Sequence, residues 1–84
     1  AATSRLRLAE FRIKDAASRL DLADQALSHA VRMWELGRVS SFELINRYRA
    51  VLAARREDVA ARVALRQVEA RLMRLLGGIE EDWS

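Results

Sequence analysis

Two kinds of residue in this sequence are common in catalytic and metal sites: the single histidine and a few hydroxyl and carboxylate side chains. His29 has no second metal ligand at a spacing of three or four residues, where Gln25, Arg32 and Met33 stand. We therefore expect a structural or exposed role for this histidine, with no metal ion and no cofactor.

The hydroxyl and carboxylate side chains do not form a catalytic pattern either. Ser40 and Ser41 have no neighbouring histidine or other base that could activate a hydroxyl as a nucleophile. Glu57 and Asp58 are adjacent, so on a helix they point in different directions and cannot act as acid and base on one bond. Gly37 stands alone, so no glycine-rich phosphate loop is present. The sequence predicts that this protein is not an enzyme.

Arginines recur along the second half of the chain, at Arg47, Arg55, Arg62 and Arg66. A basic row of this kind could follow the phosphates of a nucleic acid, as in an RNA-binding hairpin. Acids are interleaved with the arginines, aromatic residues are few, and the formal net charge is only +3. We therefore keep a basic RNA-binding hairpin only as a minor alternative and expect no nucleic acid partner.

The stretch 34–44 carries the signals of a helix that stops and reverses. Gly37 follows a periodic apolar run and can adopt the left-handed conformation that closes a helix, so the first helix should end at Leu36. Residues 37–40 then form the tip of a hairpin.

A second helix should begin directly after this tip. Ser40 and Glu43 have the spacing of a capping box, in which the serine oxygen accepts from a first-turn amide and the glutamate reaches back to the serine N–H. Val39 and Leu44 have the spacing of a hydrophobic staple, which fixes the direction in which the chain enters the helix.

Apolar residues repeat every seven residues on both sides of the tip, as in a coiled coil. Before the tip, one row is Leu6, Ile13, Leu20, Leu27 and Trp34, and the row three residues on is Ala9, Ala16, Ala23 and Ala30. After the tip, the rows are Leu44, Val51, Asp58, Leu65 and Leu72, and Arg47, Ala54, Ala61, Val68 and Leu75. Folding back at the tip matches these rows and pairs Leu20 with Asp58 and Ala16 with Ala61, with close helix approach along the alanines.

The fold class predicted is therefore all-α, an antiparallel two-helix coiled-coil hairpin. We expect helices over about 4–36 and about 41–76, with Gly77–Gly78 ending the second helix and a tail over 77–84. The first turn has arginines and no acid, which disagrees with the helix dipole and suggests a fragment of a longer chain.

Both helices carry more apolar surface than one seam can cover. Outside the seams lie Leu8, Phe11, Leu22, Val31 and Met33 in the first helix, and Phe42, Ile45, Leu52, Val59 and Met73 in the second. Apolar faces this wide need further neighbours, so the hairpin should self-associate or join a larger helical bundle or barrel.

The tip and second helix resemble the TolC family of bacterial outer-membrane efflux proteins. The resemblance rests on an aromatic residue, a glycine three later, a small hydroxyl residue, an acid and two aliphatics: Trp34, Gly37, Ser40, Glu43, Leu44 and Ile45. An alanine- and leucine-spaced helix follows and ends in Leu76–Gly77. The similarity is clearest over residues 27–78.

The resemblance implies a periplasmic hairpin of an outer-membrane efflux or secretion channel, a homo-oligomer that is a trimer at full length. It implies that the tip docks a periplasmic adaptor (membrane fusion) protein, which connects the channel to an inner-membrane pump. It places Gly37, Arg38, Val39, Ser40 and Ser41 at the docking surface. It assigns Trp34, Glu43 and Asn46 to the channel gate.

A second reading does not need the channel. The same hairpin can be an autonomous coiled-coil interaction module that dimerises into a four-helix bundle. In that case the tip residues only reverse the chain. The two readings therefore differ in what the tip binds, and both predict the same fold.

Overall fold

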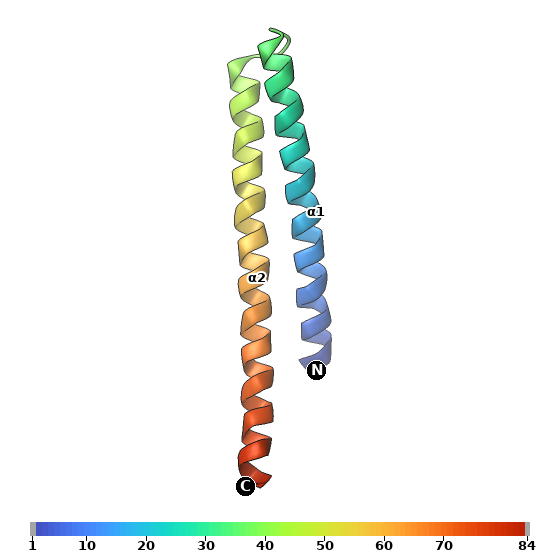
Figure 1. Cartoon of the computed structure of the whole chain (residues 1–84), viewed down its shortest axis with the longest axis vertical. Coiled ribbons are helices and arrows are strands. Elements are labelled where there is room, and N and C mark those ends of the chain that lie inside the picture. The colour runs from blue at the N-terminus through green and yellow to red at the C-terminus, as the bar shows by residue number, and fades with distance from the viewer. Residues whose placement is uncertain (1, 84) are drawn as a thin grey trace.

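The structure, a computed structural model, describes residues 2–83, including the side chains of residues 4–77. Two helices make up this part of the chain, α1 (Ala2–Glu35) and α2 (Ser41–Trp83). They lie side by side and antiparallel, joined by a short turn at one end of the molecule (Figure 1). The hairpin is a rod of 70 × 15 × 14 Å. The predicted all-α helical hairpin is confirmed.

The turn end of both helices agrees with the sequence to within one residue. The helix α1 stops at Glu35 instead of Leu36, and α2 begins at Ser41 as predicted. At the other end α1 already begins at Ala2, two residues before the expected start. Such differences are within the usual uncertainty of a helix end.

The predicted end of α2 at Leu76 is wrong. The helix continues through Gly77 and Gly78 to Trp83, so the expected tail 77–84 is helical up to its last described residue. Gly77 does not have the positive φ that a glycine helix stop requires. A helical glycine costs only about 0.5–1 kcal/mol relative to alanine, and breaking the helix would leave its last carbonyls without partners.

The alanine rows form the centre of the interface. The buried side chains are Ala9, Ala16 and Ala30 of α1 and Val51, Ala54 and Ala61 of α2. The predicted partners Ala16 and Ala61 line one hollow between the helices, and the guanidinium of Arg19 lies 3.5 Å from the carboxylate of Glu57 across it. These neighbours agree with the predicted register. The close approach follows because a methyl group keeps two backbones less far apart than a leucine does.

The row of large residues is less well covered than the alanine row. Leu6, Ile13, Leu20 and Leu27 are only half-buried. A two-helix rod has one neighbour per helix, so a long side chain is covered on one flank and open to solvent on the other. No side chain among the described residues is both large and fully buried.

Asp58 is the polar member of the seam in α2, level with Leu20. Its side chain is 16% exposed, and its Oδ2 accepts from Nε of Arg62 at 3.2 Å. Its Oδ1 is buried and has no hydrogen-bond partner. The pairing with Arg62 therefore satisfies only one of the two carboxylate oxygens of Asp58.

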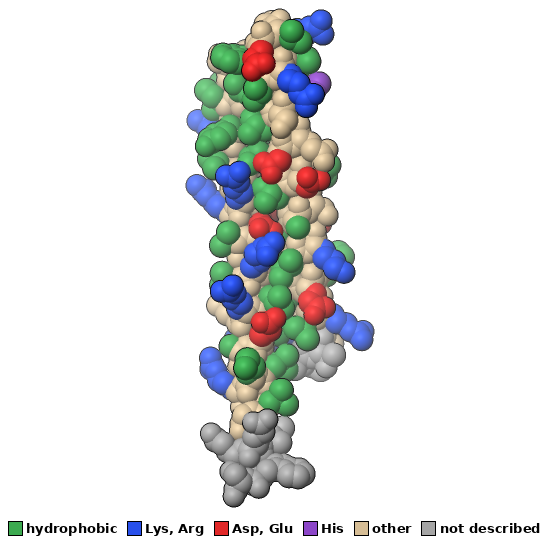
Figure 2. All heavy atoms as spheres, viewed as in Figure 1, with side chains coloured by type: hydrophobic (Ala, Val, Ile, Leu, Met, Phe, Trp, Pro, Cys, Tyr) green, Lys and Arg blue, Asp and Glu red, His purple; other side chains and the backbone are tan. Residues whose placement is uncertain are grey.

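Large apolar side chains remain exposed along both helices. Those more than half exposed include Phe11, Leu22, Phe42, Val59 and Met73. Figure 2 shows apolar side chains spread over the whole length of one face of the rod, interrupted by charged ones. Neither α1 nor α2 offers, over the described residues, an apolar stretch long enough to cross a bilayer.

Candidate docking site at the hairpin turn

The end of α1 is closed by two backbone hydrogen bonds around Gly37. The N–H of Gly37 donates to the carbonyl of Trp34 at 2.9 Å, and the N–H of Arg38 donates to the carbonyl of Met33 at 2.8 Å. This pair of bonds is a Schellman motif. Gly37 has a φ of 71°, which a residue with a Cβ adopts only at a cost. The glycine is therefore required by the backbone of the turn.

The start of α2 is capped by Ser40. Its Oγ accepts from the N–H of Glu43 at 3.2 Å, and its carbonyl accepts the first helical bond from the N–H of Leu44 at 3.2 Å. The reciprocal half of the predicted capping box does not form, because no hydrogen bond from Ser40 N–H to the Glu43 side chain is found among the described residues. Val39 and Leu44 are both half-buried, as a hydrophobic staple requires.

A side-chain hydrogen bond that the sequence did not predict joins the two helices across the turn. Nε1–H of Trp34 donates to Oγ of Ser41 at 3.3 Å. The indole belongs to the last turn of α1 and the serine to the first residue of α2. The five-residue connection is thus held at both ends and across its width.

The five predicted docking residues lie together at one end of the rod. Gly37, Arg38, Ser40 and Ser41 are exposed, and Val39 is half-buried between them. No other part of the described chain reaches this end of the hairpin (Figure 1). A partner that approaches along the long axis therefore meets these residues first.

The three predicted gate residues are near the turn, and one of them lines a hollow between the helices. Trp34 is 45% exposed and bonded to Ser41. Glu43 lines a hollow of about 300 Å³ between the helices, together with His29 and Arg47. Asn46 is exposed and does not line this hollow. The structure therefore places Glu43 in one hollow with Arg47, which follows it by four residues on α2.

The single histidine lines the hollow near the turn, together with one acid and one base. It is lined by Ala26, His29, Ala30, Met33, Val39, Glu43 and Arg47. With one carboxylate, one imidazole and one guanidinium it does not offer a metal-ligand set. No group of three or more His, Cys, Asp or Glu side chains that could hold a metal is found within the described part of the chain.

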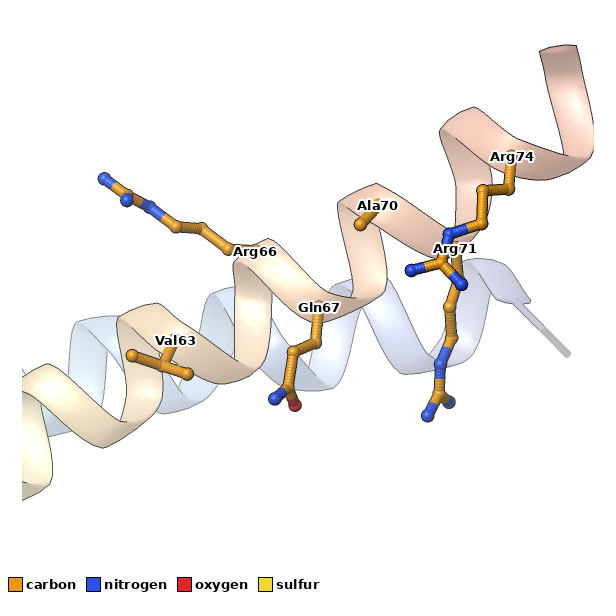
Figure 3. Close-up of a pocket in the computed structure, with 6 residues that line it drawn as sticks. All are labelled: Val63, Arg66, Gln67, Ala70, Arg71 and Arg74. Carbon is orange, nitrogen blue, oxygen red and sulfur yellow. The ribbon is translucent and has the colours of Figure 1, made fainter.

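A larger hollow lies on α2, towards the end opposite the turn. It has a volume of about 470 Å³ and is lined by Val63, Arg66, Gln67, Ala70, Arg71 and Arg74 (Figure 3). All of these residues belong to one helix, so the hollow is a shallow surface between long side chains. It contains no acid and no nucleophile, and nothing in it suggests a reaction.

Comparison with known proteins leaves the family open. No family model matches the chain, and no curated protein or solved structure matches it with significant similarity.

Proposed function

We propose that this chain is the periplasmic coiled-coil hairpin of an outer-membrane efflux or secretion channel similar to those of the TolC family. The observation that carries the proposal is the turn. Trp34, Gly37 and Ser40, which carry the family resemblance, each take part in a hydrogen bond that shapes it. The residues of the motif are therefore the residues that build the exposed end of the rod.

Docking of a periplasmic adaptor protein at residues 37–41 fits the physical character of this end. A surface that is already ordered before binding loses little conformational entropy when a partner covers it. The two caps and the Trp34–Ser41 bond supply that order. The adaptor would in turn connect the channel to an inner-membrane pump.

A role in gating is proposed for Trp34, Glu43 and Asn46, all within about three helical turns of the tip. Glu43 and Arg47 share a hollow, so the negative charge at this level of the channel would be partly compensated by a base of the same helix. The gate would depend on the indole and on this pair more than on isolated acids.

Assembly with further helices is supported by the exposed apolar side chains of both helices. Phe11, Leu22, Phe42 and Val59 are 59–71% exposed in the hairpin. This many exposed large apolar side chains on two helices favour burial against further helices. In the channel the partners would be the other helices of a homotrimer, and the 84 residues alone would form smaller assemblies such as dimers.

The same exposed surface also supports the second candidate, an autonomous coiled-coil module that forms a four-helix bundle. The turn separates the two. In the channel its residues contact an adaptor, and in the module they contact only solvent.

Fractionation of source cells tests the channel directly. An antibody raised against the 84 residues should detect a protein several times heavier than 9.6 kDa in the outer-membrane fraction. A soluble band close to 9.6 kDa would establish a free-standing module and end the channel proposal.

Photo-crosslinking tests docking at the turn. A photoreactive residue replacing Arg38, exposed in the turn, should capture a periplasmic adaptor in source cells. The control is the same residue at Ser18, exposed in the middle of α1, which should not capture it. Equal capture from both positions, or none from Arg38, would rule out the turn as the docking surface.

A further inference from the structure

A row of apolar residues on α2 is only partly covered in the hairpin. Ile45, Leu52 and Val59 recur every seven residues, and Arg66 continues the row. Ile45 is 48% and Val59 59% exposed, and a shallow hollow of about 410 Å³ lies along Leu52 and Val59. A seven-residue period keeps such a row in line with a neighbouring helix. The row therefore fits a helix.

Arginines without acid partners flank this row. Arg49, Arg56 and Arg66 form no ion pair with a carboxylate of the described residues. The ion pairs present there use Arg19 and Arg62 instead. A helix that covers this side of α2 should therefore supply carboxylates.

One side of α1 has the complementary character. Glu10, Ala17, Asp24 and Val31 form a row at the same seven-residue spacing, and all four are exposed. Asp21, next to this row, accepts a hydrogen bond from Gln25 at 2.9 Å. Among the described residues, Glu10, Asp21 and Asp24 have no ion pair with a base. The apolar members of this acidic row, Ala17 and Val31, are small or medium in size.

The register inside the hairpin shows how the two rows would meet between two copies. Arg19 of α1 is level with Glu57 of α2, to which it is ion-paired at 3.5 Å. If a second hairpin lies alongside with its turn at the same end and at the same height, its α1 has the same level relative to the first α2.

This arrangement brings together two apolar pairs and two pairs of opposite charge, and it places one carboxylate, Asp24, level with an apolar residue, Leu52. Val31 is then level with Ile45, and Ala17 is level with Val59. Asp24 lies level with Leu52 and Glu10 with Arg66, while Asp21 lies beside Arg56.

We propose that the acidic row of α1 binds the basic, apolar row of α2 in a second copy of this chain, with the turns of both copies at the same end. The contact joins two different surfaces, so it can repeat from copy to copy and close into a ring or continue as a chain. It does not depend on whether the hairpin belongs to a channel.

Charge reversal at the two rows tests the proposal on the 84-residue chain by sedimentation equilibrium. The wild-type chain should self-associate, and more weakly at high salt. The double variant Arg56→Glu, Arg66→Glu should lose about tenfold or more in association affinity, since like charges then face each other. The double variant Asp21→Arg, Glu10→Arg should show the same loss.

Mixing the two double variants is the diagnostic step. The wild-type α1 row of the first variant fits the wild-type α2 row of the second, and the two reversed rows also fit each other, so the mixture should recover association that neither variant shows alone. Circular dichroism should show unchanged helix content, because all four positions are exposed.

A matched control changes the same net charge elsewhere on α2. Arg71→Glu with Arg74→Glu should leave association within about twofold of wild type, because these residues lie near the open end, level with the start of α1. Figure 3 also shows Arg66 and Arg71 extending from opposite sides of the helix.

Three results would overturn the proposal. The first is a wild-type chain that stays monomeric at millimolar concentration. Binding of this monomer to vesicles of anionic phospholipid or to an RNA would not rescue the proposal, because the rows would then have another partner. The second is normal association of either double variant. The third is failure of the mixed variants to associate while both are folded.

Discussion

Gly37 and Gly77 stand near opposite ends of α2, and the chain treats them differently. Gly37 has a φ of 71° and is followed by a reversal of the chain. Gly77 lies inside a helix that continues to Trp83. A Cβ built on either glycine meets no atom within 4 Å, so crowding explains neither behaviour. The difference must come from what the backbone on each side can bond to.

At Gly37 the reversal leaves few backbone groups unpaired. Gly37 and Arg38 donate to carbonyls at the end of α1, and Ser40 accepts from the first turn of α2. Leaving the helix at Gly77 would remove the partners of several carbonyls and bring no such caps. A glycine thus permits a helix to stop, and the caps that follow decide whether it does.

The seam between the helices holds the hairpin together along its length. A substitution there should therefore have the largest effect on the free energy of unfolding. Leu20→Asp places a second carboxylate level with Asp58, whose Oδ1 already lacks a partner. It should destabilise the hairpin by about 2–5 kcal/mol, through a lost seam leucine and an uncompensated charge. Thermal unfolding followed by circular dichroism measures this loss.

The control for this substitution is Leu22→Asp on the outer side of α1. Leu22 is 65% exposed, so its replacement should change the free energy of unfolding of the monomer by about 0.5 kcal/mol or less. Equal losses from both variants would mean that Leu20 is not opposite α2.

The closed end is tested by Gly37→Ala. Alanine should keep the turn, but its Cβ makes the left-handed backbone conformation unfavourable. We expect the free energy of unfolding to fall by about 1–2 kcal/mol. Urea denaturation at a concentration where the chain is monomeric measures it. Gly37→Asn should lose distinctly less, because asparagine tolerates this conformation better. If alanine and asparagine behave alike, backbone strain at residue 37 is not what makes the glycine necessary.

The seam also contains a position that should gain stability. Asp58→Leu removes a carboxylate oxygen that is buried without a partner and restores the leucine expected at this heptad position. We expect a gain of about 1 kcal/mol. The matched control is Glu57→Leu, because Glu57 is exposed and its ion pair with Arg19 is a surface pair worth little. A loss of stability in Asp58→Leu would show that the Arg62 pair stabilises the seam.

The residues around the turn and the alanine rows made most of the fold predictable. Gly37 and Ser40 are informative as a pair of local signals, because together they satisfy backbone groups within a few residues. The register followed from two heptad rows that agree on one pairing. Both kinds of signal are short-range or strictly periodic, and both are confirmed.

Other features depend on geometry that the sequence does not state. The Trp34–Ser41 bond forms only once the turn has brought the two helix ends together. The capping box shows the opposite. The sequence pattern predicted two hydrogen bonds between Ser40 and Glu43, and only the bond from the Glu43 N–H to the Ser40 Oγ is found. The docking and gate assignments rest on resemblance, and they stay predictions because a hairpin can use the same turn with or without a partner.

The open end provides the smallest effect and the sharpest contrast with Gly37. Gly77→Ala should favour the helix by about 0.5–1 kcal/mol, since alanine loses less backbone entropy and its Cβ meets no other atom. Gly77 lies beyond the level at which α1 begins, so the gain should be local. Amide hydrogen exchange in the neighbouring turns of α2 should slow by about two- to fivefold, while the global unfolding midpoint stays nearly unchanged. Alanine at residue 37 should do the opposite, shifting the global midpoint downward. If Gly77→Ala instead speeds exchange, the glycine is needed for a bend or stop in α2. Both glycines would then serve a special backbone conformation.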